Sequence, residues 1–200
     1  MPFDPKPVIL EGRHVRLEPL AERHRAEMRI RAAEAGAETF RWFINDGIAD
    51  PVAFDRWFDA ALEGARRSSE VTWATLRRND GRLVGSTRYL DIRRAHRALE
   101  IGNTWLAPDA RRTAVNTEAK YLQLRHAFDE LGTVRVQLKT DARNETSRRA
   151  IARLGGVLEG VLRNYQTRDD GFVRDTVIFS LIATEWPAAR ALLEARINPT

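Results

Sequence analysis

Residues 106–117 read LAPDARRTAVNT, and the patterns on either side of this stretch decide the fold. A strand pattern over residues 99–106 stops at Pro108, because proline cannot donate to a strand ladder. A helix pattern follows over residues 117–131, with apolar residues on one face and Gly132 just past its end. A strand, a tight basic loop and a long helix in succession predict a domain in which helices pack on a sheet.

Further strands and helices are predicted on both sides of this stretch. Before it, the sequence predicts one strand, two helices and a hairpin, at residues 15–20, 21–35, 52–65, 71–76 and 83–91. After it, the sequence predicts a strand, a helix, a second hairpin and a C-terminal helix, at residues 134–139, 144–154, 157–166, 173–182 and 185–197. This order predicts an α/β fold with a mixed sheet and no domain boundary.

The length and composition predict a single domain over residues 1–200, with 43% hydrophobic residues for one sizeable core. Three prolines among the first seven residues predict a loose N-terminal arm over residues 1–9. No run approaches the roughly 20 apolar residues of a membrane helix. The first residues also lack a secretory-signal pattern, so we expect a cytoplasmic protein without a membrane partner.

Several kinds of chemistry are excluded or disfavoured by composition. The absence of cysteine excludes disulfides, thiolate catalysis and cysteine-based zinc sites. Four histidines are scattered without metal-ligand spacing, so we expect no metal. The net charge of +5 favours anionic partners such as a phosphorylated cofactor, although arginine-rich compositional bias explains it equally well. A nucleic-acid-binding domain is one alternative function, but the dispersed charge argues against a nucleic-acid partner.

The loop before the long helix is a candidate anion site. A helix N-terminus offers unpaired N–H groups and the positive end of the helix dipole. Arg111 and Arg112 add charge-assisted bonds, and Thr113, Asn116 and Thr117 can donate bonds or cap the helix. An ordinary strand-to-helix turn with solvent-facing arginines fits the same pattern.

A second helix start, at Asn144 to Ser147, follows the next strand. Asn144 there can simply cap the helix, with Ser147 partly buried. If the strands at 99–106 and 134–139 are parallel neighbours, however, both helix N-termini open at the same edge of the sheet. Ligands bind at that edge in open α/β sheets.

These motifs together resemble the GNAT (Gcn5-related N-acetyltransferase) family, in its RimJ/RimL-like branch. The resemblance runs from Leu10 to Pro187. The motifs that carry it, by their order and spacing, are LEGRHVRLEPL at 10–20, EIG at 100–102, TEA at 117–119, Asn144 with Ser147, and Arg174-Asp175. It implies a mixed, mostly antiparallel sheet flanked by helices, with a parallel central strand pair. It also implies acetyl-CoA as cosubstrate and an amine as acceptor.

The family's pyrophosphate loop usually reads Gln/Arg-x-x-Gly-x-Gly/Ala, and here it reads RRTAVN, with Ala114 and Asn116 in place of the glycines. The resemblance implies that the cofactor contacts Leu106, Arg111, Arg112, Thr113, Ala114, Val115, Asn116, Thr117, Asn144 and Ser147. The altered glycine positions put the affinity for CoA in question more than the fold.

The implied mechanism is direct attack of a neutral amine on the acetyl thioester. Many family members protonate the leaving thiolate with a tyrosine, but Ile151 stands at that position, and Ser147 is the candidate in its place. Glu100 is the candidate base, although a carboxylate paired structurally with an arginine fits equally. A backbone N–H near Leu106, freed by a bulge or strand divergence, would stabilise the oxyanion.

The acceptor site is expected among the aromatic residues of the first helices. Trp42, Phe43 and Tyr89 are the candidates, and Glu38 and Asp46 could attract a cationic amine. Core packing is the alternative for most of these aromatics. The acceptor could be a protein N-terminus or a small-molecule amine, and a non-catalytic acyl-CoA-binding module is the alternative of a different class. The resemblance also suggests a homodimer.

Overall fold

The computed structural model describes residues 3–44, 48–168 and 170–198. Within these ranges, eight strands form one sheet in the order β1-β2-β3-β4-β5-β6-β8-β7. The pair β5–β6 is parallel and the other neighbours are antiparallel. The strands are β1 (Leu10–Glu11), β2 (Val15–Pro19), β3 (Val71–Arg77), β4 (Leu83–Arg93), β5 (Ala98–Leu106), β6 (Arg135–Asp141), β7 (Val157–Thr167) and β8 (Val173–Ile182). The expected mixed sheet with a parallel central pair is confirmed.

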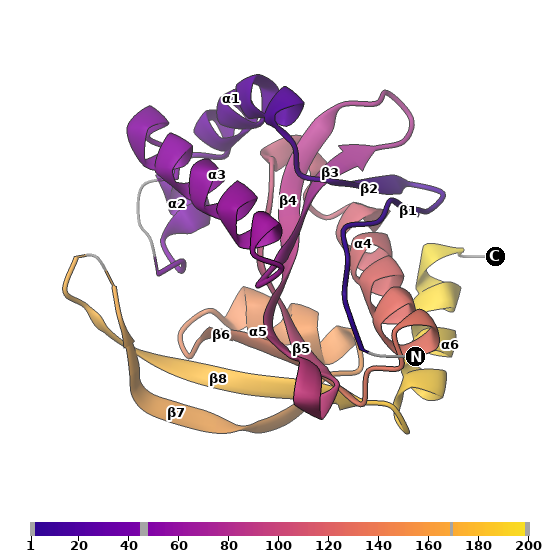
Figure 1. Ribbon diagram of the computed structural model, residues 1–200. Coiled ribbons are helices and arrows are strands. Elements are labelled where there is room, and N and C mark those ends of the chain that lie inside the picture. Colours follow the sequence, from indigo (N-terminus) through magenta and orange to yellow (C-terminus); the bar gives the residue numbers. More distant parts are fainter. Residues whose placement is uncertain (1–2, 45–47, 169, 199–200) are drawn as a thin grey trace.

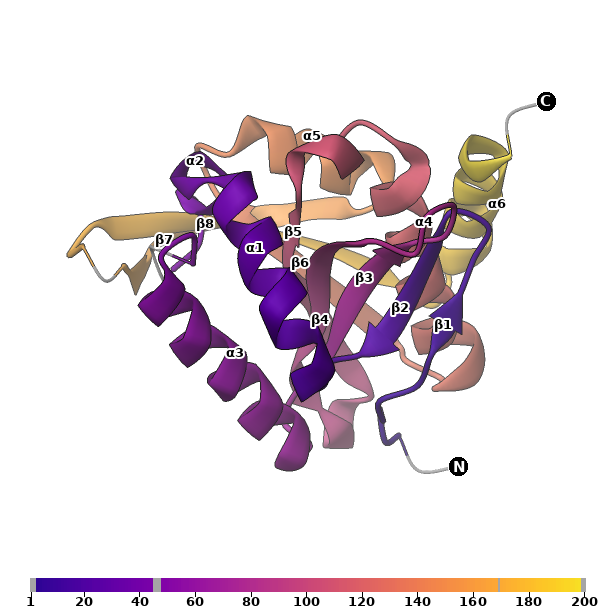
Figure 2. The ribbon, with the colours of Figure 1, turned by 90° about the horizontal axis from the view of Figure 1, so that it is seen from above.

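Helices flank this sheet in two groups, with α1 and α3 in one group and α4 beside α6 in the other (Figures 1 and 2). The helices are α1 (Arg25–Ala35), α2 (Ala37–Phe40), α3 (Pro51–Arg66), α4 (Ala114–Arg125), α5 (Glu145–Arg153) and α6 (Trp186–Ile197). None in the described ranges combines the length and apolarity needed to cross a membrane.

Two helix boundaries differ from the prediction. The helix predicted over residues 21–35 begins with a 3-10 turn, and α1 follows it. The helix expected from Thr117 begins earlier, because Thr113 is its N-cap and accepts a hydrogen bond from the Val115 N–H. Its last turn, residues 126–130, is a π-helix, so the expected helix changes geometry before Gly132.

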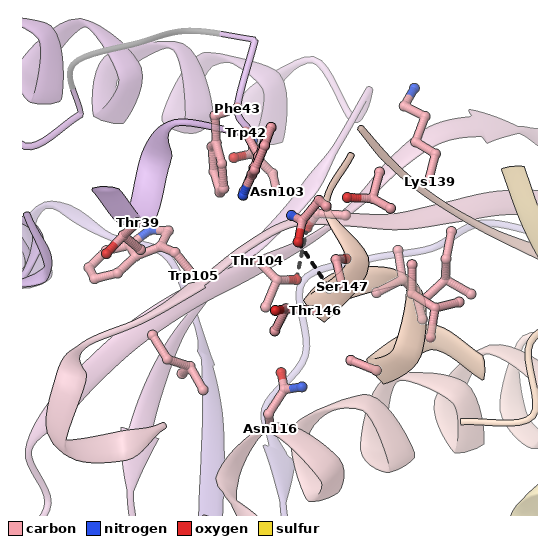
Figure 3. A pocket seen from close by; sticks show the side chains of 18 of the residues that line it. Thr39, Trp42, Phe43, Asn103, Thr104, Trp105, Asn116, Lys139, Thr146 and Ser147 are labelled. Atoms are coloured by element: carbon pink, nitrogen blue, oxygen red, sulfur yellow. Dashed lines mark hydrogen bonds between the residues drawn. The ribbon is translucent and has the colours of Figure 1, made fainter. Parts of the chain in front are cut away.

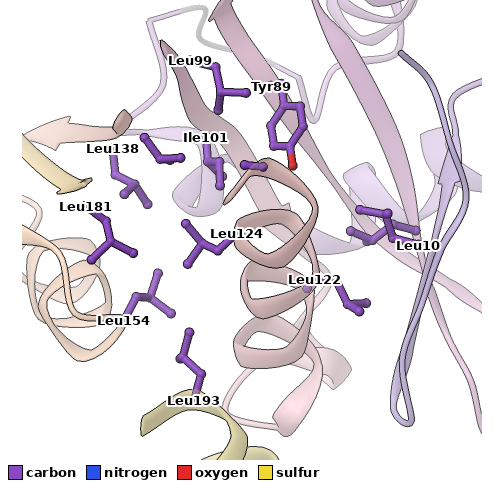
Figure 4. Packing of buried hydrophobic residues seen from close by; sticks show 14 of the residues in the cluster. Leu10, Tyr89, Leu99, Ile101, Leu122, Leu124, Leu138, Leu154, Leu181 and Leu193 are labelled. Atoms are coloured by element: carbon purple, nitrogen blue, oxygen red, sulfur yellow. The ribbon is translucent and has the colours of Figure 1, made fainter. Parts of the chain in front are cut away.

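Alternation along the strands divides the core into two layers. On β3, Trp73 belongs to the layer under α4, and the adjacent Ala74 belongs to the layer under α1–α3. Figure 4 shows the first layer, in which Leu122 and Leu124 of α4 lie near side chains from the strands. Both layers fix the position of β5, a central strand that carries part of the candidate site.

The segment expected to be a loose arm is anchored instead. Phe3 is buried in the first core layer, and the carbonyl of Val8 accepts a 2.7 Å hydrogen bond from the Trp73 indole. The segment from Phe3 to Val8 therefore packs on the sheet, because an apolar side chain and a backbone acceptor both find partners there.

The parallel pair opens beyond its first residues. The pairing of β5 with β6 runs from Ala98–Arg135 to Glu100–Gln137, and the strands diverge after Glu100. A register shift between β4 and β5 accompanies the divergence, with Asn103 in the left-handed region at φ 49°. The divergence therefore opens the sheet between the ends of two parallel strands, each of which leads into a helix.

Candidate active site

A cavity of about 640 Å³ occupies the divergence between β5 and β6. Residues from β5, β6, α4, α5, β8 and the segment around α2 line it, and Figure 3 shows ten of them labelled. This volume is in the range of small-molecule and cofactor sites. The cavity also lies at the sheet edge where ligands of open α/β sheets bind.

The N-terminus of α4 borders the cavity. Leu106, Arg111 and Asn116 line it. Arg111 Nε donates to the Leu106 carbonyl at 3.0 Å, and Arg111 Nη2 donates to Thr39 Oγ1 at 2.5 Å. The loop is thereby tied both to the end of β5 and to the segment around α2, with the arginine charge at the mouth of the cavity.

The other residues of the predicted loop lie around this helix start. Arg112 is exposed and has a left-handed backbone at φ 59°. Thr113 caps the helix, and its hydroxyl donates to the Ala110 carbonyl at 2.7 Å. Val115 is buried in the core, whereas Ala114 and Thr117 are half-buried in the first turn. The loop therefore presents Arg111 and Asn116, and not every predicted side chain, to the cavity.

The N-terminus of α5 borders the same cavity, as the parallel-strand argument predicts. Asn144 Oδ1 accepts a hydrogen bond from the Ser147 N–H at 3.0 Å, so Asn144 caps the helix. Asn144, Ser147 and Ile151 all line the cavity. Asn116 and Ser147, from two helix starts, therefore share one site with the polar ends of both helices.

Glu100 lines the cavity at the last position where β5 pairs with β6, and it is 2% exposed. Its Oε2 is 3.0 Å from Lys139 Nζ and accepts a 3.4 Å hydrogen bond from Gln137 Nε2. The pairing partner is thus a lysine and not the arginine considered from sequence. Burial raises the pKa of Glu100, and the charge of Lys139 opposes part of that rise. A raised carboxylate pKa suits a general base.

Aromatic residues form one wall of the cavity. Trp42, Phe43 and Glu38 line it, and Figure 3 shows the two aromatic side chains above Trp105. Arg174 of β8 donates from Nη1 to the Trp42 carbonyl at 2.9 Å, which ties this wall to the sheet. Phe40 and Phe58 are core residues, whereas Asp46 lies outside the described residues.

The assignment of Tyr89 to the acceptor site is wrong. Tyr89 is fully buried in the layer under α4, where its ring packs edge-on against Trp73 with 4.7 Å between the ring centroids. Its hydroxyl donates to the Gln123 carbonyl of α4. Alternation along β4 is regular here, since Tyr89 pairs with Val71 on β3 and shares its face with Thr87, but the sequence does not tell that α4 covers this face.

Sequence reasoning missed Lys120, which is 6% exposed and lines the cavity from α4. Burial lowers its pKa to about 7. One signal was available, because Lys120 follows Asn116 by four residues and therefore lies on the same face of the helix. Its hydrogen-bond partners on β4 and β5 depend on the tertiary structure.

Comparisons with known proteins agree with this geometry. The model of the acetyltransferase (GNAT) domain family matches residues 14–157. A GCN5-related N-acetyltransferase from Brucella melitensis is 31% identical, with a TM-score of 0.91 over 98% of this chain and 88% of that one. YdaF of Bacillus subtilis, provisionally named a ribosomal N-acetyltransferase, is 32% identical over 54% of this chain and 57% of YdaF. Mycobacterium smegmatis RimJ, solved in complex with CoA-disulfide, shares the fold at 22% identity and a TM-score of 0.82 over 95% of each chain.

The family match covers most of the sheet and both helix starts that border the cavity. The similarity to YdaF supports the RimJ/RimL-like branch, and RimJ has the same fold. Sequence, fold and cavity therefore lead to one conclusion: this chain belongs to the GNAT acetyltransferase family.

Proposed function

We propose that this protein transfers the acetyl group of acetyl-CoA to a primary amine by direct attack, in the cavity between β5 and β6. The observation that carries the proposal is the meeting of two helix N-termini and a buried carboxylate in one cavity. Helix N-termini bind phosphate groups, and a buried carboxylate can remove the proton of an ammonium ion.

The residues at the α4 end fit a pyrophosphate. Thr113 caps one first-turn N–H, that of Val115, and neighbouring N–H groups of this turn are left for a ligand. Arg111 and Asn116 add a guanidinium and an amide at the cavity. The other loop residues named from sequence would play a smaller part. Arg112 would add positive charge nearby, and Ala114 and its neighbours would contribute mainly backbone groups.

Three groups would act on the reacting atoms. Glu100 would take a proton from the acceptor ammonium, so that the amine attacks in its neutral form. A backbone N–H of the diverging part of β5, near Leu106, would donate to the carbonyl oxygen as negative charge develops there. Ser147 would donate a hydrogen bond to the sulfur. Acetyl-CoA supplies the activated thioester carbonyl, and the cavity orients it against the amine.

The acceptor we propose first is the α-amine of a protein N-terminus. The provisional name of YdaF as a ribosomal N-acetyltransferase supports this class. The wall formed by Trp42, Phe43 and Glu38 can receive an apolar segment that ends in a cation. A small-molecule amine is the alternative acceptor for the same chemistry.

The first experiment is calorimetric titration of acetyl-CoA, with adenosine 3′,5′-bisphosphate as the control. We expect saturable binding that is tighter for acetyl-CoA. Thiol release is then followed with 5,5′-dithiobis(2-nitrobenzoate), which has no background because the chain lacks cysteine. Short peptides with free N-termini are compared with the same peptides acetylated and with small amines. Binding without thiol release for any acceptor would indicate a non-catalytic module, and no binding would refute the proposal.

A homodimer is proposed through the edge strand β7. Val157, Leu158, Val161 and Leu162 are 42–52% exposed on this strand. A second copy related by a two-fold axis would bring the same strand antiparallel to the first, pairing both open edges and covering these side chains.

A further inference from the structure

Lys120 is a buried cation whose hydrogen-bond partners are neutral. Its Nζ donates to Thr104 Oγ1 at 2.6 Å, to Thr87 Oγ1 at 2.7 Å and to Gln123 Oε1 at 3.1 Å. These three oxygens match the three hydrogens of the ammonium group. Because neutral oxygens compensate a buried positive charge incompletely, the ammonium gives up a proton readily, and burial lowers the pKa of Lys120 to about 7.

The hydroxyl protons of this network can be assigned by elimination. Thr87 Oγ1 donates to Gln123 Oε1 at 3.0 Å, which uses its only proton. Thr104 Oγ1 accepts from Lys120, so its own proton points to Thr87 Oγ1 at 2.8 Å or to the Gly102 carbonyl at 3.3 Å. The Thr87 oxygen has a second lone pair beside the one that accepts from Lys120, so the Thr104 hydroxyl can donate to it at 2.8 Å, while the bond to Gly102 is long. To donate into the cavity, the Thr104 hydroxyl has only to turn away from Thr87.

The two threonines differ in their access to the cavity. Thr104 lies on β5 beside Asn103, lines the cavity and is labelled in Figure 3. Thr87 lies on β4, is 1% exposed and is enclosed between the sheet and α4. Both bond to the same ammonium group, but Thr104 alone of the two connects that group to the space where the thioester would lie.

Resting on the proposed function, we propose that Lys120 supplies the proton for the leaving thiolate through the hydroxyl of Thr104. When the carbon–sulfur bond breaks, its electron pair goes to sulfur. The Thr104 hydroxyl proton then moves to sulfur as an Nζ proton of Lys120 moves to Thr104 Oγ1. The products are a free thiol, an intact Thr104 and a neutral Lys120. Lys120 itself lines the cavity and regains a proton from water after the thiol leaves.

Other charged and titratable groups around this network have their own partners. On α4, Glu118 accepts backbone N–H groups at Arg13, His14 and Val15, and on the following turn His126 bonds to Glu130. On β4, Tyr89 donates to the Gln123 carbonyl, and Arg88 pairs with Glu70. On β5 and α6, Glu100 pairs with Lys139 and Glu194 with Arg190. Burial is accordingly the cause of the lowered pKa of Lys120.

Thr104→Val and Thr87→Val are matched variants, because each removes one hydroxyl bonded to Lys120 and keeps the side-chain shape. Thiol release is measured with acetyl-CoA and the peptide Ser-Ala-Ala-amide, and also with acetyl-CoA alone, where water is the acceptor. We expect Thr104→Val to lower kcat about 100-fold, the order found for general acid catalysis, and Thr87→Val to lower it clearly less, because Thr87 holds Lys120 but does not reach the cavity. Equal losses in the two variants would refute the relay and leave a structural role.

The pH profile separates proton supply from packing. In the wild type, kcat should fall as pH rises above about 7, where Lys120 loses its proton. Lys120→Met should lose this basic limb together with most of kcat, and Lys120→Arg should lose it too, because a guanidinium keeps its proton over the measured pH range. A basic limb that persists unchanged in Lys120→Met overturns the proposal.

A third readout is independent of turnover. The chain has three lysines, Lys6, Lys120 and Lys139, so NMR of lysine labelled with 13C and 15N gives few signals. The signal that disappears in Lys120→Met should titrate near pH 7. A midpoint above about pH 9 overturns the relay even if the protein is an active acetyltransferase. Failure of the wild type to bind acetyl-CoA would instead refute the proposed function, a result that calorimetry identifies separately.

Discussion

Glu100 of β5 and Lys139 of β6 form an ion pair of 3.0 Å where the two parallel strands begin to diverge. The Glu100 carboxylate is buried, and Lys139 extends from β6, which separates from β5 beyond this point. The pair therefore couples the shape of the cavity to the protonation of the candidate base. Burial raises the pKa of Glu100, and the positive charge of Lys139 makes this rise smaller.

Lys139→Met should raise the pKa of Glu100 further, because it removes the charge that favours the carboxylate. A base acts in its deprotonated form, so the acidic limb of kcat/KM against pH should move to higher pH. Glu100→Gln should lower kcat about 100-fold and abolish that limb. An acidic limb that is unchanged in both variants would assign Glu100 a structural role.

Arg111 and Arg112 offer a matched test of cofactor binding. Arg111 lines the cavity, and Arg112 is exposed beside it. Arg111→Ala should weaken acetyl-CoA binding at least about tenfold by calorimetry, since a charge-assisted bond contributes roughly 1.5–3 kcal/mol and each step of about 1.4 kcal/mol is tenfold. Arg112→Ala should change Kd by less than about twofold. Equal effects would show that general positive charge, and not position at the cavity, controls binding.

The fold could be predicted from sequence because its signals are local. Periodicity and turn residues gave the order of strands and helices, and the parallel pair followed from two strand–loop–helix units. The start of α4 was misjudged because Thr113 is the N-cap, so the helix begins at Ala114 and not at the predicted Thr117. Capping depends on which hydroxyl reaches a backbone N–H, and several residues of this loop could have done so.

The site could be predicted only in part, because side-chain direction depends on long-range pairing. The side chains of Asn116, Asn144 and Ser147 reach the cavity from helix starts, where direction follows from the motif. Tyr89 follows the regular alternation of β4, but the face on which it lies is covered by α4, and only the tertiary structure shows that. Lys120 acquires its character from burial against two strands that are distant in sequence.

Lys120 should also make stability depend on pH. Its pKa is about 7 in the folded protein and near 10.5 when unfolded, so between these values the unfolded state binds more protons. Folding stability should therefore rise with pH from about 7 toward 10. Relative to the wild type, Lys120→Met should have its most favourable Tm below pH 7, and this advantage should shrink as pH rises. A Tm difference that is constant from pH 6 to pH 10 would contradict the lowered pKa.

The exposed apolar side chains on the edge strand β7 lead us to expect a homodimer. Leu162 on β7 and Leu192 on α6 are 42% and 41% exposed, so they are matched in exposure and differ in location. Leu162→Glu should shift the protein from dimer to monomer in size-exclusion chromatography with light scattering, because two buried charges would face each other across the two-fold axis. Leu192→Glu should leave the dimer intact. A wild-type monomer at about 100 μM, well above the Kd expected for a stable dimer, would remove β7 as the interface.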